Sequence, residues 1–508
     1  MIIGKKLKNM TNKIIALLLL LMVINNNYAQ KNQIPSLGKD EMIQDIDFLY
    51  NAIKEVCPNL DIRKKVTGTD LYAELDNLRV SSSKINTFEE FYYLASKMLI
   101  LSQDQHNNLV SFAPKEKNHY ISNKAKRISE VCEFTFDKHK PNNCTDVTYI
   151  NGEYFFHEDI SNMENLEIMI PYSAKLLAIN NIPIDEYIQK WNRKVDSSIR
   201  WDFKNNKYYT NRLYQPYFTG LSDDIYTITY SLNDSTQTIN MNVSHGIAGR
   251  AYSDSSVDKV LYFTDKDILY IRIAQMDFQK IKFYQQEIRK YHDKKIKKII
   301  IDIRDNGGGS DLVWTNVLSA IIDKPITIEE KLYLRNSPLV IDYMENIRKA
   351  KINTQNPVKL ANIENGSFID ISGKKTISPS KNSINFEGKI YVLVNHKCFS
   401  SALAFSAFCN RTDKLITVGQ PTNSIGGTGI TPFFFTLPNS KLIFEISPTL
   451  DATNVEKADD YYDNYTEICV PLSLNDVKIE QEYIGERYNK EFLYNHDVIF
   501  KAVLSIEE

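Results

Sequence analysis

A serine at the junction of an expected strand and an expected helix is the first residue that could do chemistry. Ser400 follows the apolar run Ile390–Val394 and precedes Ser401–Ala404. A serine hydroxyl is a poor nucleophile unless a neighbouring base takes its proton. At a helix start the next amide, that of Ser401, can stabilise the oxyanion that forms. The same position suits a helix N-cap, so Ser400 has two interpretations, a nucleophile or a cap.

A run of glycines is the second candidate. Gly307–Gly309 closes the segment Ile301–Asn306 and opens an expected helix. Glycine lets backbone amides approach a ligand closely, and the helix adds the positive end of its dipole. The turn could hold a phosphate or an oxyanion, or it could be a tight turn without a ligand. No Gly-Lys-Ser/Thr follows, and the glycine spacing differs from that of dinucleotide-binding loops.

A histidine is the third candidate. His106 lies in the polar segment Ser102–Leu109, two positions after Asp104. Imidazole titrates near neutral pH and can act as a general base, although a lone histidine is more often a surface or structural residue. His396 lies four residues before Ser400 and is the next candidate, with a loop residue as its plainer interpretation. No His-Glu-x-x-His motif, zinc-type cysteine pattern or phosphate loop occurs, so we expect no metal and no organic cofactor.

The elements that must position these segments can be predicted from periodicity. Residues 30–115 form a predicted helical domain, because apolar residues recur at helical spacing in Met42–Ile53 and again in Phe88–Leu101. Residues 116–255 form a β-rich module in which Ala174–Ile184 predicts strand, turn and strand, followed by a helix from Asp185. Residues 256–508 alternate strands and helices, which predicts an α/β core.

Within the core, the expected elements flank the candidate residues. The predicted strands are Ile268–Ile273, Lys298–Ile303 and Ile390–Val394, and the predicted helices contain Ile281–Tyr291, Trp314–Ile321 and Ser400–Cys409. The polar, weakly periodic residues 345–388 are expected to be an insertion or a long loop.

Composition and the N-terminus indicate an exported globular protein. The 508 residues are 43% hydrophobic and 24% charged with a net charge of −2, which excludes wholesale disorder and gives no electrostatic case for nucleic acid or an anionic membrane. Lysines precede the apolar run Ile14–Ile24, and Ala29 suits a cleavage position, so residues 1–29 are predicted to be a signal peptide. The alternative is an uncleaved anchor. We therefore expect export to the periplasm or the extracellular space, with no membrane span after signal removal. There the six cysteines could pair, in an order that spacing does not reveal.

Together and in this order, the candidate segments resemble the S41 peptidases, the C-terminal-processing (tail-specific) and tricorn-core family of serine proteases. Ile301–Gly309 resembles the family signature Asp-Leu-Arg-x-Asn-x-Gly-Gly and is the most specific match. Val394–Ala404 is similar to the nucleophile segment Thr-x-Ser-Ala-Ala-Glu, which puts the serine at Ser400. Further similarities lie at Gly419–Thr422 with Gly426 and Gly427, at Leu437–Ser440, at Glu467–Pro471 and, for a strand of the PDZ-like module, at Ala174–Ile184.

The family uses two different bases, and the sequence favours one of them. One branch pairs the serine with a lysine in Gly-Lys-Gly, but this chain reads Gly-Gly-Thr-Gly at 426–429. The tricorn-like branch uses a histidine with a serine and a glutamate orienting it, and Asp104–Asn107 resembles its Asp-x-His-Thr element. The resemblance therefore implies His106 as the base for Ser400 and Glu467 as the orienting residue. It also implies the amides of Gly308 and Ser401 as oxyanion donors.

The resemblance implies a crotonase/ClpP-like ββα core with an N-terminal helical domain and a PDZ-like module. It implies an exported serine endopeptidase whose polypeptide substrate could be recognised by its C-terminus. Departures from the family pattern, such as Leu403 where the family has Glu and Gln105 before the histidine, keep two alternatives open. One is an inactive peptide- or ligand-binding protein, and the other is a small-ester hydrolase on the same scaffold. The oligomeric state is not predicted.

Overall fold

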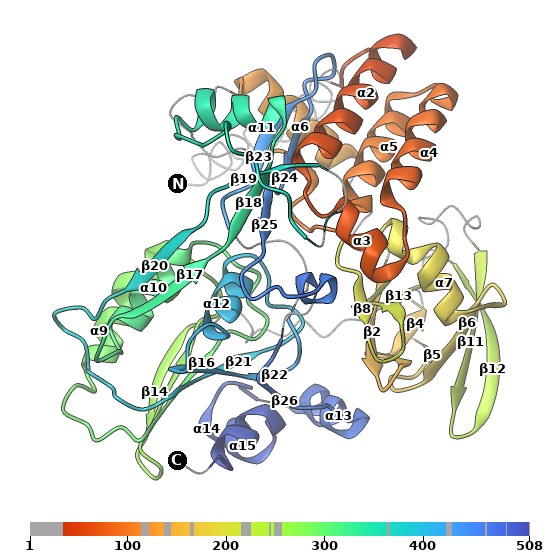
Figure 1. Cartoon of the computed structure of the whole chain (residues 1–508). Helices are drawn as coiled ribbons and strands as arrows, with labels where there is room; N and C mark the ends of the chain where they lie inside the picture. The colour runs from red at the N-terminus through yellow and green to blue at the C-terminus, as the bar shows by residue number, and fades with distance from the viewer. Residues whose placement is uncertain are drawn as a thin grey trace, which may run out of the picture.

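The structure of the chain is a computed structural model (Figure 1). It describes residues 34–112, 121–136, 144–162, 167–214, 225–242, 245–247, 257–361, 363, 366–422, 429–462, 465–483 and 485–506. The predicted signal peptide, residues 1–29, therefore lies outside the described residues. In the part of the chain that is described, no helix has the length and apolar character needed to cross a membrane.

The N-terminal part is helical, as its periodicity predicts. Its helices are α2 (Lys39–Val56), α3 (Leu60–Thr67), α4 (Leu71–Ser81) and α5 (Phe88–Leu101). A further helix, α6 (Asn123–Phe136), lies within residues 116–255, which were predicted to be β-rich. Helix α5 begins with a capping box, in which Thr87 Oγ1 accepts from the Glu90 amide while the Glu90 carboxylate accepts from the Thr87 amide. Helix α5 ends at Leu101, where the Ser102 hydroxyl donates to the Leu99 carbonyl at 2.6 Å, and the loop that carries His106 starts there.

The middle of the chain forms a β-rich module, drawn in yellow on the right of Figure 1. Its main sheet has the order β10-β2-β3-β6-β11-β12, with β7 paired to β6. The predicted strand, turn, strand and helix around Ala174–Ile184 are confirmed as β6, β7 and α7. The bounds in this module are β2 (Cys144–Ile150), β3 (Glu153–Phe156), β4 (Ile160–Asn162), β5 (Ile168–Ile170), β6 (Lys175–Ile179), β7 (Ile182–Pro183), α7 (Ile184–Lys190), β8 (Arg200–Asp202), β9 (Lys207–Tyr209), β10 (Arg212–Tyr214), β11 (Ile225–Leu232), β12 (Ser235–Asn242) and β13 (His245–Ile247).

The core is a six-stranded sheet with the order β14-β15-β16-β21-β22-β26, in which every pair except β14–β15 is parallel. Strands β15, β16 and β21 are buried along their whole length, which explains their continuous apolar runs. The predicted α/β core is confirmed. The bounds are β14 (Lys259–Phe263), β15 (Ile268–Arg272), α9 (Ile281–Arg289), β16 (Lys298–Asp302), α10 (Asp311–Ser319), β21 (Ile390–Val394), α12 (Ser401–Cys409), β22 (Leu415–Gly419), β26 (Ile468–Cys469), α13 (Leu474–Glu482), α14 (Lys490–Asn495) and α15 (Val498–Leu504).

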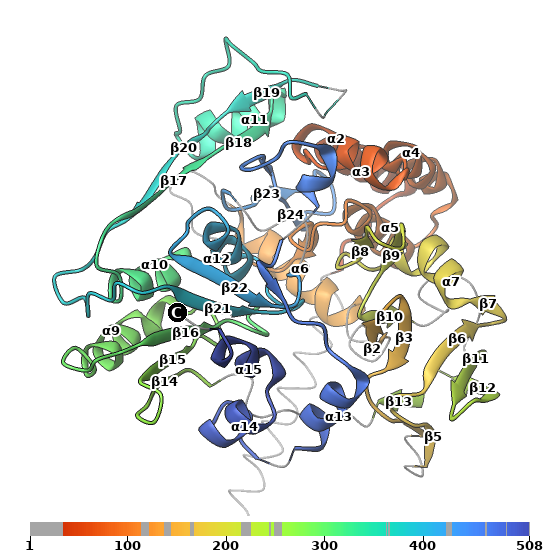
Figure 2. The same cartoon turned by 60° about the horizontal axis from the view of Figure 1, so that its bottom comes forward.

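Helices cover both faces of this sheet, and alternate residues of its strands point to each. Ile299 and Ile301 pack with Trp314 of α10 and Phe405 of α12, whereas Ile300 packs with Phe500 of α15. Figure 2 shows α12 and α15 on opposite sides of β21 and β22. The finer predictions of a crotonase-like core and a PDZ-like module stay predictions.

The expectation of a plain insertion or loop at residues 345–388 is wrong in part. The segment contains β19 (Phe368–Asp370) and β20 (Gly373–Ile377). Strand β20 pairs with β17 (Ile326–Glu330), while β19 and β25 (Thr449–Asp451) flank β18 (Leu332–Arg335). These strands are short and one side of β20 faces solvent, so their polar sequence carries little periodicity. A short helix α11 (Pro338–Asp342) and a π-helical turn at Tyr343–Ile347 precede them.

A small sheet joins the segment that follows the N-terminal helices to strands from the C-terminal half of the chain. Its order is β1-β24-β23, with β1 (Asn108–Val110), β23 (Phe433–Thr436) and β24 (Ile443–Ile446). Phe444 of β24 is buried in the same apolar cluster as Ile46 and Leu49 of α2. This sheet therefore carries the segment after α5 onto the C-terminal half of the molecule, and Figure 1 shows β24 beside α2.

Four of the described cysteines are free thiols. Cys57, Cys398 and Cys409 are buried, and Cys469 is exposed. No disulfide forms among these four residues.

Candidate active site

Ser400 and His106 lie within hydrogen-bond distance of each other. His106 Nε2 is 3.1 Å from Ser400 Oγ, although the two residues are 294 positions apart in sequence. The His106 ring also packs on the Phe399 ring, with centroids 4.5 Å apart. The structure therefore brings together the two residues that the resemblance paired.

The His106 loop is fixed on both sides by its neighbour Asn107. The Asn107 side chain donates to Ser102 Oγ at 2.6 Å and accepts from the Ser447 amide at 2.7 Å. Ser447 directly follows β24, to which β1 pairs. Both ends of this buried amide are thus bonded, which holds the imidazole against the nucleophile segment.

The backbone of Ser400 is strained. Its φ is +53° and its ψ is −123°, a region that residues other than glycine rarely occupy. The Ser400 side chain makes no capping hydrogen bond to α12. The N-cap interpretation is therefore wrong, because the hydroxyl faces the imidazole instead of the helix amides.

Two carboxylates lie beside His106. Asp104 Oδ1 accepts from the His106 amide at 2.9 Å and lies 3.4 Å from His106 Nδ1, so the ring contact is longer than a good hydrogen bond. Glu445 of β24 is the register partner of Asn108 and is 8% exposed. Burial alone would lower the pKa of His106, but Asp104 and then Glu445 outweigh it, and the pKa is raised. Burial, with the Asp104 charge, raises the pKa of Glu445 to about 7 despite the opposing effect of His106.

The structure corrects the expectation that Glu467 orients His106. Glu467 is exposed and precedes β26, where its amide donates to Thr417 Oγ1. Burial and, to a smaller extent, the Glu467 charge raise the pKa of Cys409, which lies at the far end of α12 from Ser400. The sequence resemblance at Glu467–Pro471 is imperfect, and the carboxylates that act on the imidazole are Asp104 and Glu445. Asp104 was visible in the sequence, whereas Glu445 could not be found without the β1–β24 pairing.

The glycine turn lies directly against the nucleophile. Gly308 has a φ of +105°, and a Cβ at this position would lie 2.5 Å from Ser400 Cβ. The Gly308 amide donates to Asn306 Oδ1 at 2.8 Å, so this predicted oxyanion donor is already bonded. The Ser401 amide, in the first turn of α12, makes no hydrogen bond to the described residues. In this state Ser401 is the donor that is free to receive an oxyanion.

Asn306 connects the turn to its surroundings. Its side chain donates to the Ile273 carbonyl at 2.9 Å, and its own carbonyl accepts from the Phe399 amide at 3.1 Å. Asn306 thus ties the glycine turn to β15 on one side and to the nucleophile segment on the other.

The charged residues of the signature segment form a buried network beneath the turn. Arg304 is bonded to Asp302 and to Asp497 of the α14–α15 connection, both at 2.6 Å. Arg272 of β15 is fully buried and contacts Asp302 at 3.4 Å. Burial would raise the pKa of Asp302, but Arg304 and Arg272 outweigh it and the pKa is lowered. The acids and guanidinium groups are therefore charged partners that hold the turn in place, a role that sequence reasoning missed.

A large cavity opens next to the site, between the β-rich module and the core. Its volume is about 1030 Å³, and it reaches from Gln105 and Gly307 to the C-terminal helices. His396 lines it, and burial, with the Arg200 and Lys397 charges, lowers the pKa of His396 to about 3. His396 Nδ1 lies 3.3 Å from Gln420 Oε1, so this alternative base is bonded elsewhere. The position of the other branch's lysine, within residues 423–428, lies outside the described residues.

No group of His, Cys, Asp and Glu side chains among the described residues could hold a metal ion.

The segment that contains the glycine turn and Ser400 matches a known protein family. Residues 267–452 match the model of peptidase family S41. The resemblance predicted from the sequence is therefore confirmed, and the S41 segment contains both the glycine turn and Ser400. His106 lies outside this segment and reaches it only through the fold. The match of this segment to a peptidase family model supports a serine peptidase.

Solved structures extend the likeness beyond the S41 segment. Mature CPAF aligns with a TM-score of 0.54 and 13% identity, over 87% of this chain and 95% of that chain. Mature CPAF complexed with lactacystin aligns with a TM-score of 0.53 and 14% identity, over 87% and 96%. A mutant of CPAF aligns with a TM-score of 0.55 and 12% identity, over 93% and 99%. At these identities the likeness is one of fold. No curated protein matches the chain.

Proposed function

We propose that the chain is an exported serine endopeptidase in which Ser400 is the nucleophile and His106 the general base. The observation that carries this proposal is the 3.1 Å separation of His106 Nε2 and Ser400 Oγ. The S41 match of the surrounding segment supports the reaction class. The N-terminal signal-like sequence supports export.

A residue of the site can carry out each step of peptide hydrolysis. His106 Nε2 takes the hydroxyl proton while Ser400 Oγ bonds to the peptide carbonyl carbon. Asp104 and Glu445 stabilise the imidazolium that forms, because each already raises the pKa of His106. His106 then gives the proton to the leaving nitrogen, the C–N bond breaks, and an acyl-serine remains. Water attacks that ester, with His106 taking its proton and returning one to Ser400.

The oxyanion is stabilised by the Ser401 amide, with Gly308 as the second donor. The Gly308 amide can serve only after it leaves Asn306 Oδ1. Donors aimed at a developing oxyanion typically contribute about 10²–10³ in rate each. The bound substrate carbonyl is the natural acceptor to replace the Asn306 side chain.

The cavity beside the site is where we place the polypeptide. Its walls come from the core, the β-rich module and the C-terminal helices, so a chain lying in it would contact all three. Edge strands of the β-rich module could add a C-terminal strand of substrate by backbone pairing. Recognition of the substrate's C-terminus therefore remains part of this proposal.

A fluorophosphonate probe, which reacts with activated serines, tests the proposal. We expect labelling of the wild-type protein, and loss of labelling in Ser400→Ala. Hydrolysis of an unfolded polypeptide should be lost in parallel. A folded wild-type protein that does not label would point to the non-catalytic binding protein. Labelling with hydrolysis of small esters but of no peptide would point to the ester hydrolase.

A further inference from the structure

Two cationic side chains line the cavity next to the nucleophile segment. They are Arg200 of β8 and Lys397, three residues before Ser400. The Arg200 guanidinium donates through Nη2 to the carbonyl of His396, the residue before Lys397. After burial, Arg200 and Lys397 are the main causes that lower the pKa of His396, as expected for positive charges close to the imidazole. We name Arg200, His396 and Lys397 the cationic corner.

Both cations keep donor capacity that the protein does not use. Arg200 is 6% exposed, and its Nε has no hydrogen-bond partner among the described residues. Lys397 is exposed, and no carboxylate of the described chain lies within ion-pair distance of its ammonium. A buried donor without an acceptor is unfavourable, so an acceptor delivered by a ligand would be stabilised there.

Lys397 lines the cavity, and its charge acts on residues of both walls. At Asp305, in the core, burial would raise the pKa, but Lys397 and other groups outweigh it and the pKa is lowered. At His157, which follows β3 in the β-rich module, burial and then Lys397 lower the pKa. Asp305 itself accepts from Asn395 at 2.9 Å and from Tyr488 at 3.0 Å. Lys397 therefore lines the cavity without a bonded counter-charge among the described residues.

Most acidic side chains of the cavity are already bonded within the protein. The bonded pairs are Tyr149 with Asp202, Arg304 with Asp497, Arg487 with Glu480, and Ser473 with Asp476. The exception is Asp146 of β2, whose carboxylate makes no bond to the described residues. The cavity thus has free cationic donors at one corner and one free anion, Asp146.

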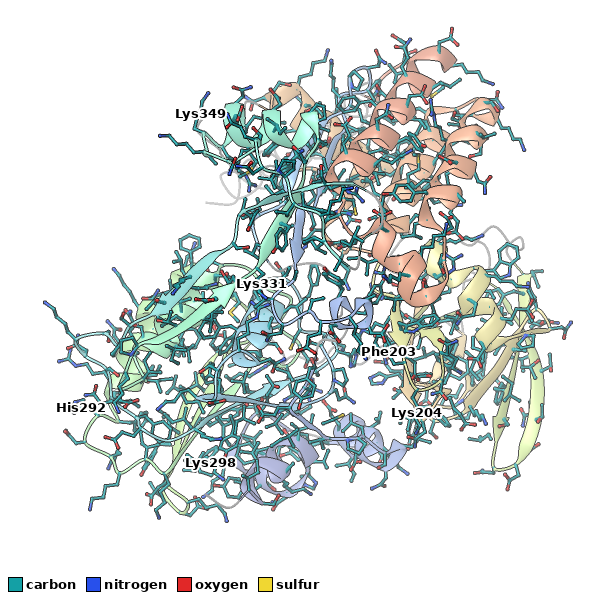
Figure 3. All side chains as sticks on the ribbon, in the orientation of Figure 1. Phe203, Lys204, His292, Lys298, Lys331 and Lys349 are labelled. Carbon is teal, nitrogen blue, oxygen red and sulfur yellow. The ribbon has the colours of Figure 1, made fainter. Side chains whose placement is uncertain are left out.

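We propose that the cationic corner binds a carboxylate of the polypeptide substrate and so sets where the chain is cut. This inference rests on the proposed peptidase function. The carboxylate can belong to an Asp or Glu side chain or to the C-terminus of the substrate. Tyr149, Trp201, Phe203 and Tyr209 line the same cavity and supply apolar contacts to the neighbouring substrate residues. Figure 3 shows Phe203 on the side of the β-rich module that faces the core.

Three synthetic peptide libraries of equal length test the inference. The first has amidated C-termini and contains Asp and Glu, the second is amidated and lacks acids, and the third lacks acids but has free C-termini. Cleavage sites are read by mass spectrometry, and kcat/KM is measured for representative peptides. We expect the first or the third library to be cut roughly 10- to 100-fold more efficiently than the second. Which of the two is preferred identifies the source of the carboxylate.

Charge variants separate the corner from the rest of the cavity. Lys397→Gln and Arg200→Gln should bring the rate ratio of carboxylate to neutral peptides toward one, whereas Asp146→Asn, which removes a repelling charge, should raise it. Lys397 makes no structural bond, so its variant remains informative if Arg200→Gln fails to fold. Lys204→Gln is the matched control, because Lys204 is exposed on the same hairpin as Arg200 but does not line the cavity (Figure 3).

Binding and labelling distinguish this inference from the proposed function. Calorimetry with Ser400→Ala and single peptides should show the same carboxylate preference without any catalysis. Equal cleavage of all three libraries by a protein that labels with fluorophosphonate would overturn the carboxylate site and leave the peptidase standing. A folded protein that neither labels nor cuts, yet binds acidic peptides, would support the carboxylate site and overturn the peptidase.

Discussion

Gly308 lies so close to Ser400 that a Cβ on the glycine would fall 2.5 Å from the serine Cβ. The contact leaves no room for any side chain between the glycine turn and the nucleophile. Gly308 also has a φ of +105°, a conformation that favours glycine, and this conformation lets its backbone lie directly against Ser400.

Gly308→Ala should therefore abolish peptidase activity. The added methyl would push Ser400 away from His106 or distort the turn, and a loss of at least about 10²-fold in kcat is expected from the oxyanion site alone. Gly373→Ala is the control, because a Cβ there meets no atom within 4 Å and Gly373, in β20, does not line the cavity. Steady-state hydrolysis and probe labelling of both variants give the answer, and comparable losses in the two would contradict the steric argument.

His106→Ala should reduce probe labelling and peptide hydrolysis almost as far as Ser400→Ala does. The reason is that the serine hydroxyl has no other imidazole within reach among the described residues, His396 being held by Gln420. His292→Ala is a matched control, since His292 is exposed and does not line the cavity (Figure 3). Full activity of His106→Ala would show that another group takes the proton.

The pH dependence of kcat/KM should shift when Asp104 is neutralised. A general base must be unprotonated, so activity rises with pH through the pKa of His106, which the carboxylates raise above its usual value near 6.5. Asp104→Asn removes an anion that favours the imidazolium, so the pKa falls and the acidic limb moves to lower pH. Glu445→Gln should move it in the same direction. A limb that stays in place in both variants would mean that these carboxylates do not act on the base.

Asp497→Ala should destabilise the protein substantially. It leaves Arg304 without one of its two carboxylates in a nearly buried site, and removing one partner of a buried pair typically costs about 3–5 kcal/mol. It also removes the N-cap of α15, where Asp497 accepts from the Phe500 amide. Asp497→Asn, which can keep the cap, should cost less. Denaturant unfolding measures the difference.

Asp265→Ala is the reference for that experiment. Asp265 pairs with Lys490 at 2.8 Å, but both side chains are well exposed, and such surface pairs contribute about 0–1 kcal/mol. A loss in Asp265→Ala as large as that in Asp497→Ala would show that burial of the network beneath the turn does not matter.

The sequence was most informative where a feature is local. Continuous apolar runs revealed β16 and β21, because strands buried on both faces need no alternation. The glycine run and the serine at a strand-to-helix junction could be recognised because they too are local in the sequence. Resemblance then linked them to His106, which no periodicity could have done.

Features that depend on pairing between distant parts of the chain could not be predicted from the sequence. Glu445 faces His106 only because β1 pairs with β24, and Asp497 meets Arg304 only because the C-terminal helices fold under the sheet. The short strands β19 and β20 were expected to be loop, since their partners lie far away in sequence. The hydrogen bond from Gly308 to Asn306 is local, yet no residue pattern reveals which way an amide points.

The pairing of β1 with β24 has a consequence for when the molecule becomes reactive. Its imidazole-bearing half is synthesised early, and the strand that positions it against the serine is among the last quarter of the chain to be made. A nascent or unfolded polypeptide therefore holds a hydroxyl and a base that never meet. The hydroxyl and the imidazole come within hydrogen-bond distance only after β24 has been synthesised and has paired with β1.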